Sequence, residues 1–370
     1  MALHLMDATM FWNATGGVRR YIVAKRRWLR RHAGWRHTLA TPLPDGDEAL
    51  AVPSLPLPGS AGAYRLPWRR AASARLMCRA RPDLIESADP YTLAWSALDA
   101  AEILGVPSVA FCHSNLERMA ALAAGRFGRA AAMQVARRYA AHLYRRFDLV
   151  LAPSAAMLGH LHAWGVEAAV QQPLGVDTRT FAPERGDRHW RTELGLPADS
   201  RVLVYAGRFA PEKNLPTLAA AVRRLGAPYW LVAIGSGPAV PSGERVMVLP
   251  PIRSATFLAR ALASADVFVH AGDQETFGLS VLEALACGLP VVGRAAEGLA
   301  EQLDDSVGRA VCNGRPEAFA EAIADVLSRD PQPLRDAARN RALANDWEQI
   351  VPTLWQKYRR LLGAPREEHA

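Results

Sequence analysis

The chain has 370 residues, half of them hydrophobic and 22% charged, with a formal net charge of +8. This length suits about two domains, and the composition excludes a chain that is disordered from end to end. The apolar runs end well short of about 18 residues, which argues against a membrane-spanning helix, and residues 1–10 lack the basic start of a signal peptide.

Short β-rich runs alternate with longer helical stretches along the chain. In the first half we expect strands at 3–6, 84–85 and 108–111, and helices at 17–31, 95–104 and 126–147. Further along, we expect strands at 149–152, 201–206, 230–234, 246–249, 267–270 and 290–292, and helices at 215–225, 256–264, 279–287 and 316–328. This alternation predicts the α/β class, with two doubly wound parallel-sheet domains.

Two irregular stretches interrupt the alternation. The stretch 41–67 has prolines at positions 42, 44, 53, 56, 58 and 67, which exclude a regular helix or a central strand and leave a long loop or several short strands. The stretch 172–197 is rich in Pro, Gly and charge and marks the domain boundary. We therefore expect one Rossmann-like domain over 1–175, a second over 176–350, and a last segment over 351–370.

The excess of positive over negative charge is confined to the first half of the chain. Residues 1–178 hold 21 Lys and Arg against 13 Asp and Glu, whereas residues 179–370 hold 23 of each. A basic surface attracts nucleic acid, a phosphorylated small molecule or a lipid headgroup. The alternative function of another class is a basic nucleic-acid-binding protein. No helix-turn-helix or zinc spacing is present, so we expect no nucleic-acid partner. The four cysteines show no metal-ligand spacing either, which is typical of a reduced, cytoplasmic protein.

Two basic segments are candidates for contact with an anionic membrane. The helix at 19–31 combines arginines and Lys25 with Tyr21, Ile22 and Trp28, and residues 68–79 form a second basic stretch. Such segments can lie on anionic lipid. The alternative is that their apolar residues belong to the protein core and that the basic residues are simply solvated.

Two features of the first half are candidate binding groups. Gly16 and Gly17 open a helix after a strand, where the backbone can approach an anion; the alternative is an ordinary turn. His113 follows the strand at 108–111, where parallel sheets present polar groups to ligands, and the alternative is a loop histidine bonded to backbone. Gly235 and Gly237 lack the third glycine of a dinucleotide fingerprint, which argues against a nicotinamide enzyme.

The second half has two stronger candidates, each directly after an expected strand. Arg208 and Lys213 lie five residues apart across a strand-to-helix turn, where two cations can converge on one diphosphate; the alternative is a solvated charged turn. Glu275 precedes the helix that Gly278 opens, and Glu283 lies on that helix among apolar residues. An unpaired carboxylate is costly there, and a helix start attracts anions.

Taken together, these motifs resemble the retaining glycosyltransferases of family 4, which have the GT-B fold of two Rossmann-like domains facing a central cleft. Glu275 and Glu283 are separated by seven residues, as in the E-x7-E motif of that family. The segments 207–214 and 275–292 also match the family, as does the linker 175–177 with Phe181 and Pro183. In the first half, only Gly16, Gly17 and His113 match.

The resemblance implies a role for each of these residues. The domain over 176–350 would bind the nucleotide sugar, the domain over 1–175 would bind the acceptor, and the segment 351–370 would include a helix that crosses back to the first domain and a tail. The diphosphate would be held by Arg208, Lys213 and backbone N–H groups of Gly16, Gly17, Phe277, Gly278 and Leu279. Glu283 would bind the ribose, and Glu275 and His113 would bind the transferred sugar. Neither a metal nor a cofactor is expected, the nucleotide sugar being a substrate.

The donor that we favour is GDP-mannose, by likeness to bacterial hexosyltransferases that build glycolipids or polysaccharides, with UDP-glucose or another UDP-hexose as the alternative. The expected location is the cytoplasm, including the inner face of the cell membrane. The sequence departs from the family at one turn: where the family often has a Gly-Gly pair, this chain has Glu297 followed by Gly298. The family motif therefore does not predict the backbone contacts that this turn makes.

Overall fold

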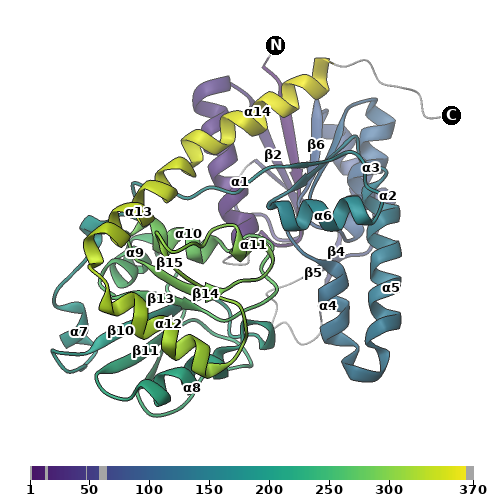
Figure 1. The fold of residues 1–370 in the computed structure, drawn as a ribbon. Helices are drawn as coiled ribbons and strands as arrows, with labels where there is room; N and C mark the ends of the chain where they lie inside the picture. The colour runs from purple at the N-terminus through teal and green to yellow at the C-terminus, as the bar shows by residue number, and fades with distance from the viewer. Residues whose placement is uncertain (1, 13–15, 47, 58–64, 364–370) are drawn as a thin grey trace. The chain divides into compact units, whose positions relative to one another are not determined.

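The computed structural model describes residues 2–12, 16–46, 48–57 and 65–363 (Figure 1). The chain divides into two compact units. The first unit comprises Met1–Pro173 together with Trp347–Ala370, and the second comprises Leu174–Asp346. The end of the tail, 364–370, lies outside the described residues, whereas the last helix, α14 (Trp347–Gly363), belongs to the first unit.

The first unit is built on a parallel sheet with the strand order β3-β2-β1-β6-β7-β8-β9. Its strands are β1 (His4–Ala8), β2 (Arg36–Thr41), β3 (Ala49–Ala51), β6 (Leu84–Ser87), β7 (Ser108–Phe111), β8 (Leu149–Ala152) and β9 (Ala169–Gln171). The other helices of this unit are α1 (Gly17–Trp28), α2 (Arg70–Ala80), α3 (Thr92–Leu104), α4 (Leu116–Ala123), α5 (Gly125–Tyr144) and α6 (Ala155–Ala163). The central strands are buried because helices cover the sheet.

The second unit has a six-stranded parallel sheet in the order β12-β11-β10-β13-β14-β15. The strands are β10 (Arg201–Ala206), β11 (Tyr229–Ile234), β12 (Val246–Leu249), β13 (Val267–His270), β14 (Val291–Arg294) and β15 (Gly308–Val311). The helices are α7 (Trp190–Glu193), α8 (Leu215–Leu225), α9 (Ala255–Ala263), α10 (Leu279–Ala286), α11 (Glu297–Ala300), α12 (Pro316–Ser328) and α13 (Pro331–Ala344). Both units therefore have the parallel α/β architecture that the alternating pattern predicts.

The proline-rich stretch 41–67 forms short strands, one of the two outcomes that its sequence allowed. Besides β3, it contains β4 (Ser54–Pro56) and β5 (Arg65–Pro67), which pair antiparallel. The predicted helix at 17–31 was too long, because the α-helix ends at Trp28 and a π-helical turn, Leu29–Ala33, follows. The predicted helix at 126–147 also ends early, at Tyr144.

Lys25 is not a surface cation, which corrects the prediction that placed it on a basic face. Its side chain is fully buried, and its ammonium group lies 2.7 Å from Asp7 Oδ1 and 2.6 Å from Glu86 Oε1. Burial raises the pKa of Glu86 by more than the charge of Lys25 lowers it. The hydroxyl of Tyr358, from α14, donates to the other oxygen of Glu86, so α14 is part of the core of the first unit.

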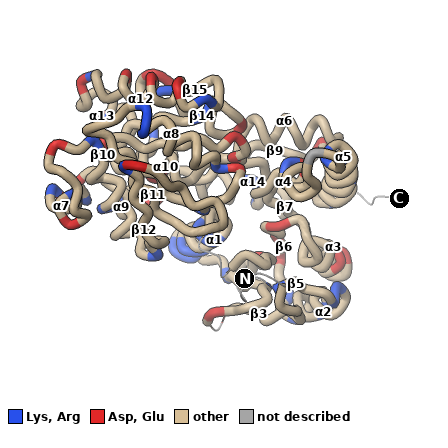
Figure 2. The backbone as a smooth tube through the Cα atoms, turned by 90° about the horizontal axis from the view of Figure 1, so that it is seen from below, with Lys and Arg blue, Asp and Glu red and all other residues tan. Residues whose placement is uncertain are grey.

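The apolar face of α1 is also part of this core. Tyr21, Ile22 and Trp28 are buried, and Leu29 follows them into the interior. These apolar side chains are therefore not available for contact with a membrane, and the arginines are the part of segment 19–31 that could contact lipid. Figure 2 shows basic residues, in blue, on α1. The second basic segment differs, because Trp68 is 58% exposed and carries the guanidinium of Arg69 over its ring. No helix in the described part of the chain is both long and apolar enough to cross a membrane.

Candidate functional site

The strongest candidate site lies in the second unit, at the edge where its parallel strands end. β10 and β13 are hydrogen-bonded neighbours, and their carboxyl ends lead into the loops that contain Lys213 and Glu275. Ligands of parallel α/β sheets bind at this edge. The structure therefore brings together two loops that lie about 60 residues apart in the sequence and that the motifs had marked separately.

The loop after β10 is fixed by backbone packing. The hydroxyl of Tyr205 donates to the carbonyl of Arg208 at 2.9 Å, and Phe209 is buried. Gly235 and Gly237 pack directly against this loop, where a Cβ atom would collide with the carbonyl of Gly207 or of Phe209. These two glycines therefore serve close packing.

The cations of this loop are placed differently from each other. The ammonium group of Lys213 forms an ion pair with Glu275, and its side chain is mostly buried. The guanidinium of Arg208 is 70% exposed and pairs with Glu212 at 3.0 Å. The structure thus joins Lys213 to Glu275 and leaves the side chain of Arg208 open to solvent, where an anionic ligand can reach it.

His270 is a third member of the cluster, although it belongs to none of the sequence motifs. Its ring is 1% exposed, and Nε2 lies 3.0 Å from Oε1 of Glu275. The backbone N–H of Gly272 donates to Nδ1 at 3.2 Å, so Nδ1 has no proton and the ring proton lies on Nε2, which donates to Glu275. The sequence did contain one indication of this role: His270 is the last residue of a predicted apolar strand, where polar side chains of parallel sheets meet ligands.

The carboxyl group of Glu275 is held in its ionised form. Burial raises its pKa, but the charge of Lys213 and the hydrogen bond from His270 lower it by more, so the pKa of Glu275 lies well below its ordinary value. An ionised carboxylate accepts hydrogen bonds and has no proton to give. Glu275 is therefore suited to holding hydroxyl groups or positive charge, and not to acting as a general acid.

The start of α10 completes this side of the site. Gly278 opens the helix with a left-handed backbone (φ +90°), and a Cβ atom there would collide with Leu299. The amide of Gln302 donates to the carbonyl of Phe277, which fixes the loop from behind. The first N–H groups of α10, beginning with Leu279, lack helical acceptors and carry the positive end of the helix dipole. This helix start can therefore receive an anion.

The turn that departs from the family motif lies against the same loop. The N–H of Gly298 donates to the carbonyl of Glu275 at 2.9 Å, and a Cβ atom at Gly298 would collide with Thr276. The preceding Glu297 adopts φ +48°, a conformation that favours glycine. Glu297 therefore occupies a backbone position that favours glycine, at the expense of backbone strain.

Glu283 lies in the second turn of α10 and is 3% exposed. Cα–Cβ bonds of a helix tilt toward its N-terminus, so the backbone at Glu283 directs its side chain toward the turn that begins at Leu279. Among the described residues, no group of three or more His, Cys, Asp or Glu side chains is arranged to hold a metal ion.

The candidate residues of the first unit lie at the corresponding edge of its own sheet. Gly16 caps α1 with an extended backbone and Gly17 is its first residue; residues 13–15 lie outside the described residues. His113 follows β7 and stacks on Phe111, with ring centroids 4.1 Å apart, and its edge packs against Tyr21. Burial and the charge of Lys25 lower the pKa of His113 to about 3, so this imidazole is neutral at physiological pH.

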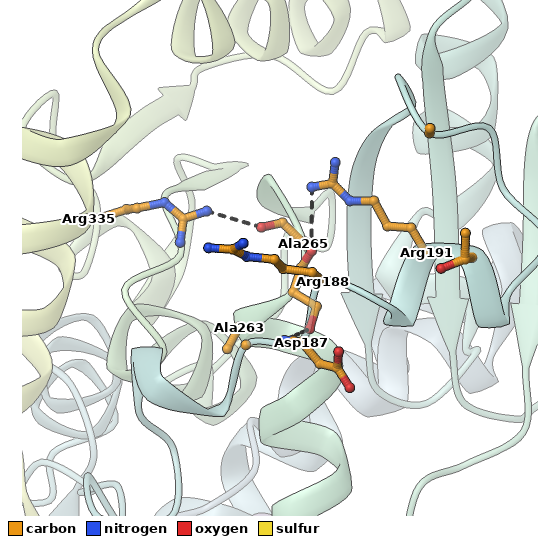
Figure 3. Close-up of a pocket in the computed structure, with 10 residues that line it drawn as sticks. Asp187, Arg188, Arg191, Ala263, Ala265 and Arg335 are labelled. Atoms are coloured by element: carbon orange, nitrogen blue, oxygen red, sulfur yellow. Dashed lines mark hydrogen bonds between the residues drawn. The ribbon is translucent and has the colours of Figure 1, made fainter.

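A cavity of about 460 Å³ in the second unit lies elsewhere (Figure 3). Its lining includes Arg188, Arg191, Ala265 and Arg335. Arg191 donates to Asp266 at 2.9 Å and Arg335 donates to the carbonyl of Ala265. These contacts lie at the amino ends of the strands, so the cavity is on the opposite edge of the sheet from the Lys213–Glu275 pair and contains none of the candidate site residues.

Two parallel α/β units, one of which carries a charged cluster at its strand edge, match the architecture of GT-B glycosyltransferases, and the comparisons with known proteins give the family. Residues 15–180 match the family model described as Glycosyltransferase Family 4, and residues 187–344 match the model described as Glycosyl transferases group 1. A GDP-mannose-dependent α-(1-6)-phosphatidylinositol dimannoside mannosyltransferase of Mycobacterium tuberculosis is 32% identical over 332 residues, covering 86% of this chain and 83% of that protein.

A GDP-mannose-dependent α-mannosyltransferase of Mycolicibacterium smegmatis is also 32% identical, over 76% of this chain and 74% of that protein. Among solved structures, the sucrose-phosphate synthase of Thermosynechococcus elongatus superposes with a TM-score of 0.80 over 98% of this chain and 100% of that chain, at 22% identity. Anabaena HepE, solved with UDP and glucose, gives a TM-score of 0.74 at 20% identity, over 99% and 100% of the chains. The chain therefore belongs to glycosyltransferase family 4 and has the GT-B fold, as the sequence motifs predicted.

Proposed function

We propose that this glycosyltransferase moves mannose from GDP-mannose to a lipid or glycan acceptor, with retention of the anomeric configuration. The observation that carries the proposal is the cluster of Lys213, Glu275 and His270 beside the start of α10. It places a cation, a fixed anion and free backbone N–H groups at one edge of a parallel sheet. The names of the relatives at 32% identity support GDP-mannose as the donor.

The proposed roles of these residues follow from the charges that develop during transfer of the sugar. When the bond between the sugar and the diphosphate breaks, negative charge develops on the leaving phosphate and positive charge develops on the sugar carbon. Lys213, Arg208 and the N–H groups of α10 stabilise the leaving diphosphate, which is the largest contribution that such a site can make. Metal ions and cofactors have no part in this proposal. Glu275, ionised and fixed, binds sugar hydroxyl groups near the reacting carbon.

The remaining residues bind the substrate. Glu283, on α10, binds the ribose hydroxyls of the donor, and the N–H groups of Gly16 and Gly17 are the candidate anion-binding groups of the first unit. His113, neutral and packed on Phe111, is the candidate sugar-binding residue of the first unit. We further propose that the protein works in the cytoplasm at the inner face of the cell membrane. The acceptor in the name of the M. tuberculosis relative, a phosphatidylinositol dimannoside, supports a lipid acceptor here.

The donor is tested by mixing the purified protein with GDP-mannose, UDP-glucose and other UDP-hexoses separately, and by measuring the release of GDP or UDP with candidate lipid and sugar acceptors. We expect GDP release from GDP-mannose, and an α-linked product by NMR. Release from UDP-sugars alone would overturn the mannose assignment and support the UDP-hexose alternative. A β-linked product would overturn retention.

A further inference from the structure

The helical hairpin of α4 and α5 extends away from the sheet of the first unit (Figure 1). α5 is attached to the body of the unit in its second half, where the hydroxyl of Tyr139 donates to the carbonyl of Pro90 at 2.8 Å. Beside it, Arg137 donates to the carbonyl of Ala163 at 2.7 Å. The dozen residues of α5 that precede these contacts span roughly 18 Å.

This part of the hairpin is exposed although it contains large apolar side chains. Phe127 is 98% exposed and Val135 is 67% exposed, and they share one helical face at a spacing of eight residues. On α4, Leu122 is 47% exposed and lies just before the turn. Of the described side chains between residues 125 and 139, none is buried; the first buried residue of α5 is Ala140.

The charge of α5 has a single sign. The helix contains four arginines and no Asp or Glu, at positions 126, 129, 137 and 138. Arg129 and Arg138 are exposed. Two copies of this chain that met through α5 would therefore bring like charges together, which disfavours self-association through this surface. An apolar tip on a basic helix instead complements a bilayer with anionic headgroups, which offers both an apolar interior and negative charge.

We propose that the α4–α5 hairpin is the surface by which the protein docks on an anionic lipid bilayer. Phe127 and Leu122 enter the headgroup region at the tip, and Arg129 and Arg138 contact lipid phosphates. Both helices follow the carboxyl end of β7, the strand edge that also carries His113. Docking through the hairpin therefore places lipid beside the acceptor side of this unit. The proposal rests on the proposed function in one respect, which is that the acceptor lies in the membrane.

The test is cosedimentation of the purified full chain with phosphatidylcholine vesicles, with or without 30 mol% phosphatidylglycerol. We expect binding to the anionic vesicles that weakens at high salt. Exchanging Arg129 and Arg138 together for Gln should weaken binding about 30-fold, at roughly a factor of five for each charge. Phe127→Asp should weaken binding at least tenfold. The matched control is Phe257→Asp on α9 of the second unit, where the phenylalanine is 63% exposed; its binding should equal that of the wild type.

The proposal is wrong if the wild type does not bind anionic vesicles. It is also wrong if Phe127→Asp and the double arginine variant bind as the wild type does while circular dichroism shows that both are folded. It is also overturned if sedimentation velocity shows a dimer that Phe127→Asp dissociates, since the hairpin would then be a contact between copies. The assay contains neither donor nor acceptor. Vesicle binding through α5 by a protein that transfers no sugar would thus contradict the proposed function and leave the docking surface in place.

Discussion

The imidazole of His270 holds the carboxylate of Glu275 at a distance of 3.0 Å, and the backbone N–H of Gly272 fixes the opposite side of the ring. A Cβ atom at Gly272 would collide with this ring, so the position requires glycine. The two contacts determine both the orientation of His270 and the nitrogen that carries its proton. His270 is therefore a positioning residue for Glu275, and the ammonium group of Lys213 contacts the same carboxylate oxygen, Oε1.

His270→Ala should reduce kcat/KM by roughly 100-fold, because the carboxylate of Glu275 loses a fixed donor and can move from its productive position. His270→Gln keeps an N–H donor and should lose less, and both losses should fall mainly on kcat. The measurement is donor turnover with the best sugar donor, and the control is His189→Ala, which removes an exposed histidine of the same unit. Wild-type kcat/KM in His270→Ala would exclude the positioning role.

Lys213→Ala and Glu283→Ala should each abolish transfer while circular dichroism remains that of the folded protein. Loss of the ammonium group removes stabilisation of the leaving diphosphate, an effect of at least about 100-fold. Lys213→Arg should restore little, because a planar guanidinium does not replace a compact ammonium in a mostly buried position. The control is Arg224→Ala, which removes an exposed cation 3.5 Å from Glu317. Near-normal turnover in both site variants would refute the assignment.

Glu297→Gly should stabilise the second unit by about 1 kcal/mol, because a residue with a side chain at φ +48° is strained and glycine is not. The expected rise in the thermal midpoint is roughly 2–4 °C. Glu297→Ala keeps the strained backbone without the carboxylate and should show no such gain. Glu301→Gly, at an ordinary φ of −76° in the next turn, should lower the midpoint instead. Equal midpoints for Glu297→Gly and Glu297→Ala would show that the strain has no measurable effect.

The strands and helices of the second unit could be predicted closely because each is a short, apolar run or an amphipathic stretch with clear ends. The strand at 201–206 and the helices at 215–225 and 316–328 match residue for residue. The position of the Lys213–Glu275 pair follows from topology, since both residues come directly after neighbouring strands. What the sequence does not contain is which strands are neighbours, and the ion pair itself was therefore not predicted.

The errors have a common physical origin, which is that burial of a polar residue depends on partners far away in the sequence. Lys25 lies within a run of arginines, and this pattern predicts a surface cation. In the structure, however, Lys25 is buried and forms ion pairs with Asp7 and Glu86. His270 reads as the end of an apolar strand, and only the approach of Glu275 and Gly272 reveals its role. Burial of apolar residues also depends on distant parts of the chain. The apolar residues of α1 belong to the core, whereas Phe127 on α5 is exposed.

Asp89 gives the first unit a pH-dependent stability. Burial raises its pKa to about 6, although the N–H of Met10 donates to it at 2.7 Å and partly offsets this effect. Because the pKa in the folded protein lies above that of an ordinary Asp, the stabilising contribution is complete below about pH 4 and is lost as the pH rises through 6. The loss amounts to roughly 3 kcal/mol for a shift of about two pKa units.

Asp89→Asn removes this titration and keeps an oxygen that can accept from Met10. The free energy of unfolding, measured in urea, should therefore increase in the variant relative to the wild type between pH 4 and 7, because only the wild type loses stability there. Above pH 7 the difference should stay constant. Glu102→Gln, an exposed carboxylate on α3 of the same unit, controls for the loss of one surface charge. A difference between Asp89→Asn and the wild type that does not change with pH would contradict a raised pKa for Asp89, because the difference in proton uptake between the folded and unfolded states is what produces the slope.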